Sequence, residues 1–134
     1  ALKASKILYK NGIKCEIIDL ISLKPLNINR IIKSLKKTKR LLVLDTGFPY
    51  CSIASEITSL ISQKMYNKLK HPPVIMTMPD IPEPTSFNLT KNLYINHLKI
   101  IEKISKIFKK KISKSNKKLI KNHDVPGDWF KGPF

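Results

Sequence analysis

Few residues of this sequence combine the type and the spacing that chemistry requires. Asp45 directly follows a short apolar run, residues 41–44. A carboxylate at the end of a strand can act as a general acid or base. It can also accept hydrogen bonds from the backbone N–H groups that follow and so stabilise a turn. We favour the second interpretation and expect Asp45 to cap the turn.

The turn after Asp45 lacks the features of a phosphate-binding loop. It contains one glycine, Gly47, and the next two residues, Phe48 and Pro49, would obstruct the close approach of a phosphate group. No Ser/His/Asp or Cys/His set occurs at a recognisable spacing. We therefore predict no catalytic, cofactor-binding or metal-binding residue in this chain.

The histidines and cysteines are isolated from one another. His71, His97 and His123 have no metal-ligand neighbours, so we expect surface or packed side chains. Cys15 and Cys51 are too few for a disulfide framework, and we expect two small buried side chains.

The chain is strongly basic, with a formal net charge of +17 over 134 residues. The basic residues are 24 Lys and only 2 Arg, accompanied by 20 Ile and 9 Asn. Arg is the side chain that reads bases and grips phosphates with a forked geometry, so this composition favours compositional drift over nucleic-acid binding. A basic nucleic-acid-associated protein remains the alternative.

With no signal-peptide pattern and no apolar run of membrane-spanning length, we expect a cytoplasmic protein, or one of an organelle matrix in a eukaryote.

Helical and apolar strand patterns alternate along the chain. Gly12, Asn27 and Ser52 are suited to the ends of helices, the first as a C-terminal glycine and the others as N-caps. The predicted elements are a helix over residues 1–11, a strand over 15–20, a helix over 28–35, a strand over 41–44, a helix over 53–65, a strand over 74–78 and a helix over 94–112. This order predicts an α/β fold with a mostly parallel sheet flanked by helices.

Two segments are rigid and carry no regular pattern. Phe48, Pro49 and Tyr50 form an apolar cluster on the turn after the central strand, where either local packing or a subunit contact could explain them. Residues 79–87 contain three prolines and should form an extended loop held against another surface.

Several segments resemble one known family, the C-terminal domain of the beta subunit of thiamine-diphosphate-dependent 2-oxoacid dehydrogenases, as in the pyruvate dehydrogenase complex. Residues 15–27, CEIIDLISLKPLN, are similar to its EVIDLRSLxPLD segment. The other similar segments are 36–44 (KKTGRLVVV in the family), 47–49 (GWP), 54–57 (AEI) and 80–84 (DVPxP). The family's small pair after GWP is here Cys51-Ser52.

This resemblance implies a transketolase C-terminal-type domain over residues 1–112, followed by a basic and polar tail over 113–134. The family's first strand and its thiamine-pyrimidine-binding domain have no counterpart in this sequence. A related transketolase or deoxyxylulose-phosphate synthase would share the domain type.

The resemblance also implies a function for the parent enzyme, the oxidative decarboxylation of a 2-oxoacid with transfer of the acyl group to lipoyl. Thiamine diphosphate and Mg belong to that parent enzyme, and we expect none to be bound by this chain. The implied partners are the alpha subunit, a second beta subunit and the dihydrolipoyl acyltransferase core.

Two surfaces are predicted on this basis. Because residues 99–121 carry ten Lys and one Glu, we expect the acyltransferase either to dock with an acidic surface or to avoid the basic helix from Leu98 to Ile120. The predicted subunit-interface residues are Phe48, Pro49, Tyr50, Asp80, Pro82 and Pro84. The predicted docking residues are Asp124, Asp128 and the carboxylate of Phe134.

Overall fold

The computed structural model of the chain describes residues 1–90 and 93–112. The predicted docking residues Asp124, Asp128 and Phe134 lie outside this part. The elements in order are α1 (Leu2–Lys10), α2 (Ile28–Thr38), β1 (Leu42–Leu44), α3 (Ile53–Lys64), β2 (Val74–Met76), α4 (Phe87–Thr90) and α5 (His97–Phe108). None of the helices in this part is long and apolar enough to span a membrane.

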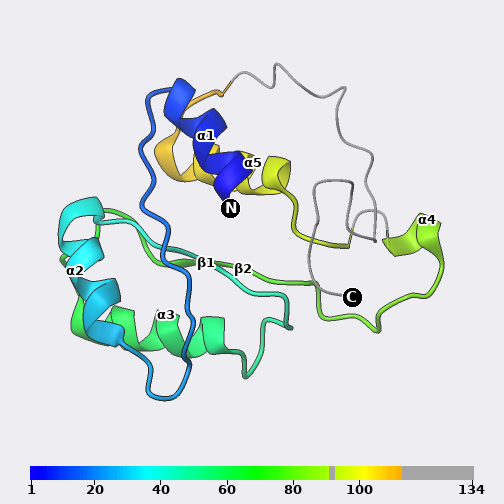
Figure 1. Ribbon diagram of the computed structural model, residues 1–134, viewed down its shortest axis with the longest axis horizontal. Helices are drawn as coiled ribbons and strands as arrows, with labels where there is room; N and C mark the ends of the chain where they lie inside the picture. The colour runs from blue at the N-terminus through cyan, green and yellow to red at the C-terminus, as the bar shows by residue number, and fades with distance from the viewer. Residues whose placement is uncertain (91–92, 113–134) are drawn as a thin grey trace.

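A two-stranded parallel sheet lies at the centre of the fold (Figure 1). Its register pairs Leu42 with Val74 and Leu44 with Met76. In Figure 1, α1 and α5 lie on one face of this sheet, and α2 and α3 lie on the other. The predicted α/β architecture, with a parallel sheet flanked by helices, is confirmed.

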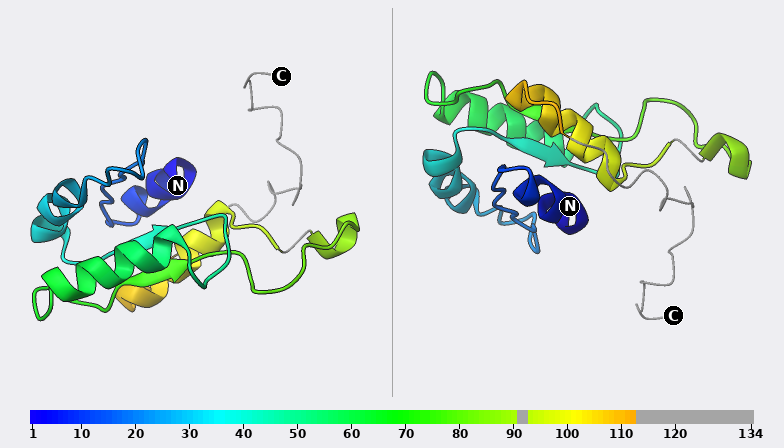
Figure 2. Two further views of the ribbon diagram at one scale, coloured as in Figure 1. Left: turned by 90° about the horizontal axis from the view of Figure 1, so that it is seen from below. Right: turned by 90° about the horizontal axis from the view of Figure 1, so that it is seen from above.

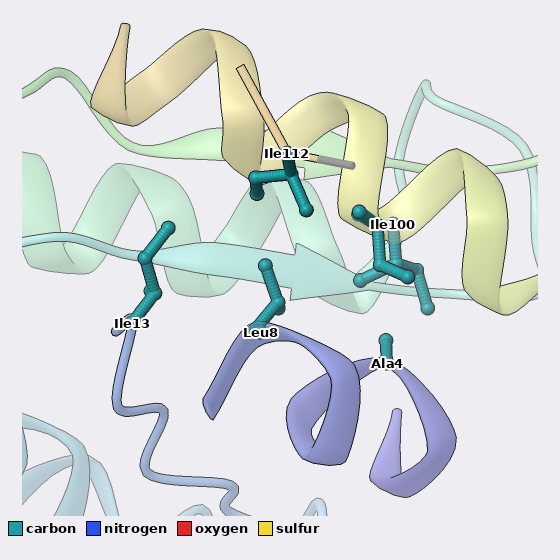
Figure 3. Close-up of a cluster of buried hydrophobic side chains, with 6 residues drawn as sticks. Ala4, Leu8, Ile13, Ile100 and Ile112 are labelled. Carbon is teal, nitrogen blue, oxygen red and sulfur yellow. The ribbon is translucent and has the colours of Figure 1, made fainter. Parts of the chain in front are cut away.

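Each face of the sheet has its own apolar cluster, as strand alternation requires. Leu42 packs toward α1 and α5, whereas Leu41 and Val43 pack toward α2 and α3. Figure 3 shows the first cluster, in which Ala4 and Leu8 of α1, together with Ile13, lie opposite Ile100 of α5 and Ile112. The buried residues of this cluster are Ala4, Leu8, Ile13, Ile100, Ile101 and Ile112. Those of the second are Ile31, Leu35, Ile57, Ile61 and Met65.

The helix ends follow the predicted capping residues. The Asn27 side chain accepts a hydrogen bond from Arg30 N at 3.1 Å, and Ser52 Oγ accepts one from Ser55 N, also at 3.1 Å. Gly12 follows α1 with a φ of 78°, a conformation that glycine adopts without steric cost. All three predictions of helix ends are confirmed.

Some predictions about the elements were wrong. The segment over residues 15–20 is not a strand, because the described residues place no sheet partner beside it. The strand predicted to reach Met78 ends at Met76, and the last helix ends at Phe108 because Lys109 adopts a left-handed conformation. Cys15 and Cys51 are exposed rather than buried.

Candidate subunit interface at the turn after β1

Asp45 organises the turn that connects β1 to α3. Its Oδ1 atom accepts a hydrogen bond from Gly47 N at 2.9 Å, and its Oδ2 atom accepts one from Ala54 N at 3.2 Å. Ala54 lies in the first turn of α3, so the carboxylate also meets the positive end of the helix dipole. The prediction that Asp45 caps the turn is confirmed, and both carboxylate oxygens are occupied by this structural role.

The start of α3 is held by a second set of contacts. Ser52 Oγ accepts from Ser55 N, and Ser55 Oγ accepts from Ser52 N at 3.0 Å, which forms a reciprocal capping box. Cys51, directly before it, has a φ of 48°, a conformation that non-glycine residues adopt rarely. The turn is therefore fixed at both of its ends.

This fixed turn projects two aromatic side chains into solvent. Phe48 is 46% exposed and Tyr50 is 73% exposed, whereas Pro49 between them is half-buried. Packing within the chain leaves much of both aromatic side chains uncovered. Of the two explanations given for this cluster, local packing and a subunit contact, this exposure favours the subunit contact. Exposed aromatic side chains on a rigid turn are typical anchors for a partner surface.

The proline-containing segment after β2 lies next to this turn. Met78 N donates a hydrogen bond to Gly47 O at 3.1 Å, which joins the two segments at the carboxyl ends of the parallel strands. Residues 79–86 form no helix or strand. Asp80 and Pro82 are exposed, and Pro84 is half-buried. The structure thus brings the start of the proline-containing segment beside the aromatic turn.

A contact distant in sequence restrains the same segment. The Tyr94 hydroxyl donates a hydrogen bond to the Glu83 carboxylate, which links the proline-containing segment to the residues before α5. A groove of about 540 Å³ separates part of this region from α5, and Pro49, Met78 and Leu93 are among the residues that line it. The sequence contained no signal that would have paired Tyr94 with Glu83.

The titratable side chains of the described residues form no cluster that could hold a metal ion. No group of three or more His, Cys, Asp or Glu side chains comes together within residues 1–90 and 93–112. Although Cys15 is exposed as a residue, partial burial of its thiol raises the pKa, which disfavours the nucleophilic thiolate. Burial also lowers the pKa of His97 from its usual 6.5, with further lowering by the positive charges of Lys3 and the amino terminus. His71 contacts the carbonyl oxygen of Pro72 at 2.7 Å.

The basic surface on α5 is made mainly of lysines. Lys106 forms an ion pair with Glu102 at 3.2 Å, and both side chains are at least half exposed. Lys110 Nζ donates to Asn11 O at 2.7 Å, which ties the end of α5 to the end of α1. Arg40 stacks on the Phe108 ring, with its guanidinium carbon 4.5 Å from the ring centroid. This stack covers one of only two arginines in the chain, which weakens the case for base or phosphate recognition.

Comparison with known proteins identifies relatives over most of the chain. Residues 1–100 match the family described as "Transketolase, C-terminal domain". The chain is 36% identical over 107 residues to the pyruvate dehydrogenase E1 component subunit beta of Rickettsia bellii, an alignment that covers 80% of this chain and 33% of that protein. It is 37% identical over 110 residues to the subunit of the same name from Cyanidium caldarium, covering 82% of this chain and 34% of the relative.

A relative with a different name shows similar identity. The chain is 41% identical over 86 residues to the acetoin:2,6-dichlorophenolindophenol oxidoreductase subunit beta of Bacillus subtilis, covering 64% of this chain and 25% of that protein. The chain thus spans about a third or less of the length of these relatives. With the family match over residues 1–100 and the α/β architecture, these alignments show that the chain belongs to the transketolase C-terminal domain family, in the form found in beta subunits of pyruvate dehydrogenase.

Proposed function

We propose that this chain is an assembly and docking domain of the beta subunit of a 2-oxoacid dehydrogenase, with pyruvate as the substrate of the whole enzyme. The observation that carries the proposal is the pair of exposed aromatic side chains, Phe48 and Tyr50, on a turn that Asp45 and the capping box hold rigid. The family to which the chain belongs supports the proposed enzyme class, a 2-oxoacid dehydrogenase.

The proposed parent enzyme oxidatively decarboxylates pyruvate and passes the acyl group to a lipoyl arm. Thiamine diphosphate and Mg would be held elsewhere in that enzyme, and the chain described here would contribute contacts rather than reacting groups. The proposed location is the cytoplasm, or the matrix of an organelle in a eukaryote. The substrate assignment rests on the names of the relatives.

The proposed subunit interface consists of the aromatic turn and the proline-containing segment beside it. Its residues are Phe48, Pro49, Tyr50, Asp80, Pro82 and Pro84. Burial of an aromatic side chain yields a large apolar contact area, and a rigid turn loses little conformational entropy on binding. The proposed partners at this surface are the alpha subunit and a second beta subunit.

The docking surface that we propose for the dihydrolipoyl acyltransferase core does not include the lysines of α5. The exposed lysines of α5 would repel a basic docking module and would slow its encounter with the enzyme. We therefore assign docking to Asp124, Asp128 and the carboxylate of Phe134. Lys→Glu changes at Lys106, Lys109 and Lys110 should then leave the association rate of the full-length beta subunit with its acyltransferase-binding module unchanged across a salt series.

The interface is tested by substitution in a full-length beta subunit that carries this sequence. Phe48→Ala and Tyr50→Ala should weaken assembly with the alpha subunit, measured by sedimentation velocity. Tyr66→Ala is the matched control, because Tyr66 is 77% exposed on a different turn, close to the exposure of Tyr50. Unchanged assembly of both interface variants would contradict the proposal, as would an equal loss in the control.

The cofactor part of the proposal is tested separately. Calorimetric titration of this chain with thiamine diphosphate and Mg should give no heat of binding at micromolar concentrations. Binding in that range would show that the chain contains a cofactor site.

A further inference from the structure

The outer edge of β2 presents backbone groups that no strand pairs. Val74 N donates a hydrogen bond to the residue before β1, and Met76 O accepts one from the residue after β1, both at 3.0 Å. The backbone groups of Val74 and Met76 therefore point toward β1. Because alternate residues of a parallel strand direct their backbone groups to opposite neighbours, the N–H and C=O groups of Ile75 and Thr77 point away from β1. Within residues 1–90 and 93–112, no strand lies on that side.

The groove of about 540 Å³ beside α5 lies along this edge. Residues 75–79 line one side of it, and residues before and within α5 line the other. Met76, Met78, Leu93 and Ile95 give it an apolar lining. Figure 2 shows α5 on the β2 side of the sheet, whereas α1 lies on the β1 side. A groove that combines a free strand edge with apolar side chains suits an extended peptide, which can add a strand and bury alternate side chains.

The α5 side of this groove is basic. It contributes Lys99, Lys103 and Lys106, whose spacing of four and three positions places them on one face of the helix, and one acidic residue, Glu102. Lys106 pairs with Glu102 at 3.2 Å, and Lys99 Nζ donates to Tyr94 O at 3.0 Å. Lys103 is exposed. With three lysines against one glutamate, the groove favours acidic side chains in its occupant.

The edge strand itself does not oppose pairing. Edge strands that avoid pairing often carry lysine or proline within the strand. Residues 74–78, Val-Ile-Met-Thr-Met, contain neither, and prolines stand only at the flanking positions 73 and 79. Since proline has no N–H group, these flanks limit an added strand to a short segment beside residues 74–78.

Two other occupants fit the groove less well. Pairing of β2 with β2 of a second copy would be two-fold symmetric and would place the lysines of both α5 helices near one another, where they repel. A nucleic acid would leave the strand edge without backbone partners. In addition, Arg40, one of only two arginines, stacks on Phe108 at 4.5 Å instead of lining the groove. An acidic peptide satisfies both the backbone groups and the lysines.

We propose that the outer edge of β2 binds an extended acidic peptide of a partner protein by strand addition. The backbone of the peptide pairs with Ile75 and Thr77, and its acidic side chains, at alternate positions, face Lys103 and the neighbouring lysines of α5. Phe48 and Tyr50 do not line this groove, so peptide binding and the proposed assembly role can fail independently of each other.

Fluorescence anisotropy with a labelled peptide tests the proposal on a full-length beta subunit that carries this sequence. The probe is a seven-residue peptide of alternating Glu and Val, and it should bind saturably with a Kd below about 1 mM. Lys103→Glu should weaken this binding by about tenfold. Lys36→Glu is the matched control, because Lys36 is an exposed lysine of α2 that does not line the groove. It should change the Kd by less than about twofold.

Two control peptides separate charge attraction from backbone pairing. A peptide of alternating Lys and Val should not bind, because its charge is reversed. A Glu/Val peptide methylated at its internal backbone nitrogens keeps its charge but loses its N–H donors, and it should bind at least about tenfold more weakly. Amide hydrogen exchange then locates the bound probe. Exchange should slow at Ile75 and Thr77, whereas Val74, whose amide already donates to Leu41 O, should change little.

Several results would overturn the proposal. Absence of saturable binding, or an equal loss in Lys103→Glu and Lys36→Glu, would show that the groove does not bind the peptide. Equal affinity for the methylated peptide would show attraction by charge without strand addition. Slow exchange at Ile75 and Thr77 without any peptide would show that another part of the subunit occupies the edge. A single-stranded oligonucleotide that displaces the probe, and whose binding is lost in Lys103→Glu, would assign the groove to a nucleic acid.

Discussion

Substitution of Asp45 should test whether this carboxylate is structural or catalytic. In Asp45→Ala, Ala54 N loses its acceptor while Ala54 itself is fully buried, and an unpaired buried donor costs about 1–3 kcal/mol. Gly47 N is exposed and can donate to water instead, so the loss of its hydrogen bond to Asp45 should add only about 0.5 kcal/mol to the destabilisation. The expected loss is about 2 kcal/mol in the free energy of unfolding, or a decrease of roughly 6–10 °C in Tm for a chain of this size.

Urea denaturation followed by circular dichroism measures this loss. Asp19→Ala is the matched control, because Asp19 is an exposed carboxylate for which the described residues provide no hydrogen-bond donor. It should change the free energy of unfolding by less than about 0.5 kcal/mol. The loss of stability in Asp45→Asn should lie between those of Asp45→Ala and Asp19→Ala, since one side-chain oxygen remains as an acceptor. An Asp45→Ala variant as stable as the Asp19→Ala control would refute the capping role.

Further predictions concern the core, the pH dependence and the aromatic turn. Ile61→Ala removes a fully buried side chain and should cost about 2–5 kcal/mol, whereas the same change at Ile21, which is 98% exposed, should cost less than about 0.5 kcal/mol by urea denaturation. Because the pKa of His97 is lower in the folded chain, protonation favours the unfolded state, so stability should fall as the pH decreases below 6.5. His97→Gln should reduce this pH dependence of Tm in thermal melts. A His97→Gln variant whose Tm depends on pH as strongly as that of the unsubstituted chain would contradict the prediction. Tyr50→Ala should leave the stability of the chain itself within about 0.5 kcal/mol, because its side chain is 73% exposed; a larger loss in urea denaturation would indicate local packing.

Local signals in the sequence predicted the helices and their ends well. Asn27, Ser52 and Gly12 act through hydrogen bonds or backbone conformations within a few residues of their own positions, so neighbouring residues suffice to predict them. The role of Asp45 was predictable for the same reason, since both of its donors lie within nine residues.

The incorrect predictions involve partners that are distant in sequence or missing from the described part. Residues 15–20 have a strand-like pattern, but a strand requires a neighbouring strand, and the described residues provide none. The exposure of Cys15 follows from the same missing neighbour. The Tyr94–Glu83 hydrogen bond and the stacking of Arg40 on Phe108 join residues 11 and 68 positions apart, and no local pattern predicts such pairs.

The proposed role in assembly is tested most directly by hydroxyl-radical footprinting of the full-length beta subunit, alone and assembled with its alpha subunit. This measurement reports the solvent accessibility of individual aromatic side chains. Phe48 and Tyr50 should become protected on assembly, while Tyr66, which is about as exposed as Tyr50 in the isolated domain, should keep its reactivity. Unchanged reactivity of Phe48 and Tyr50 in the assembled enzyme would contradict the assignment of this turn as a subunit interface.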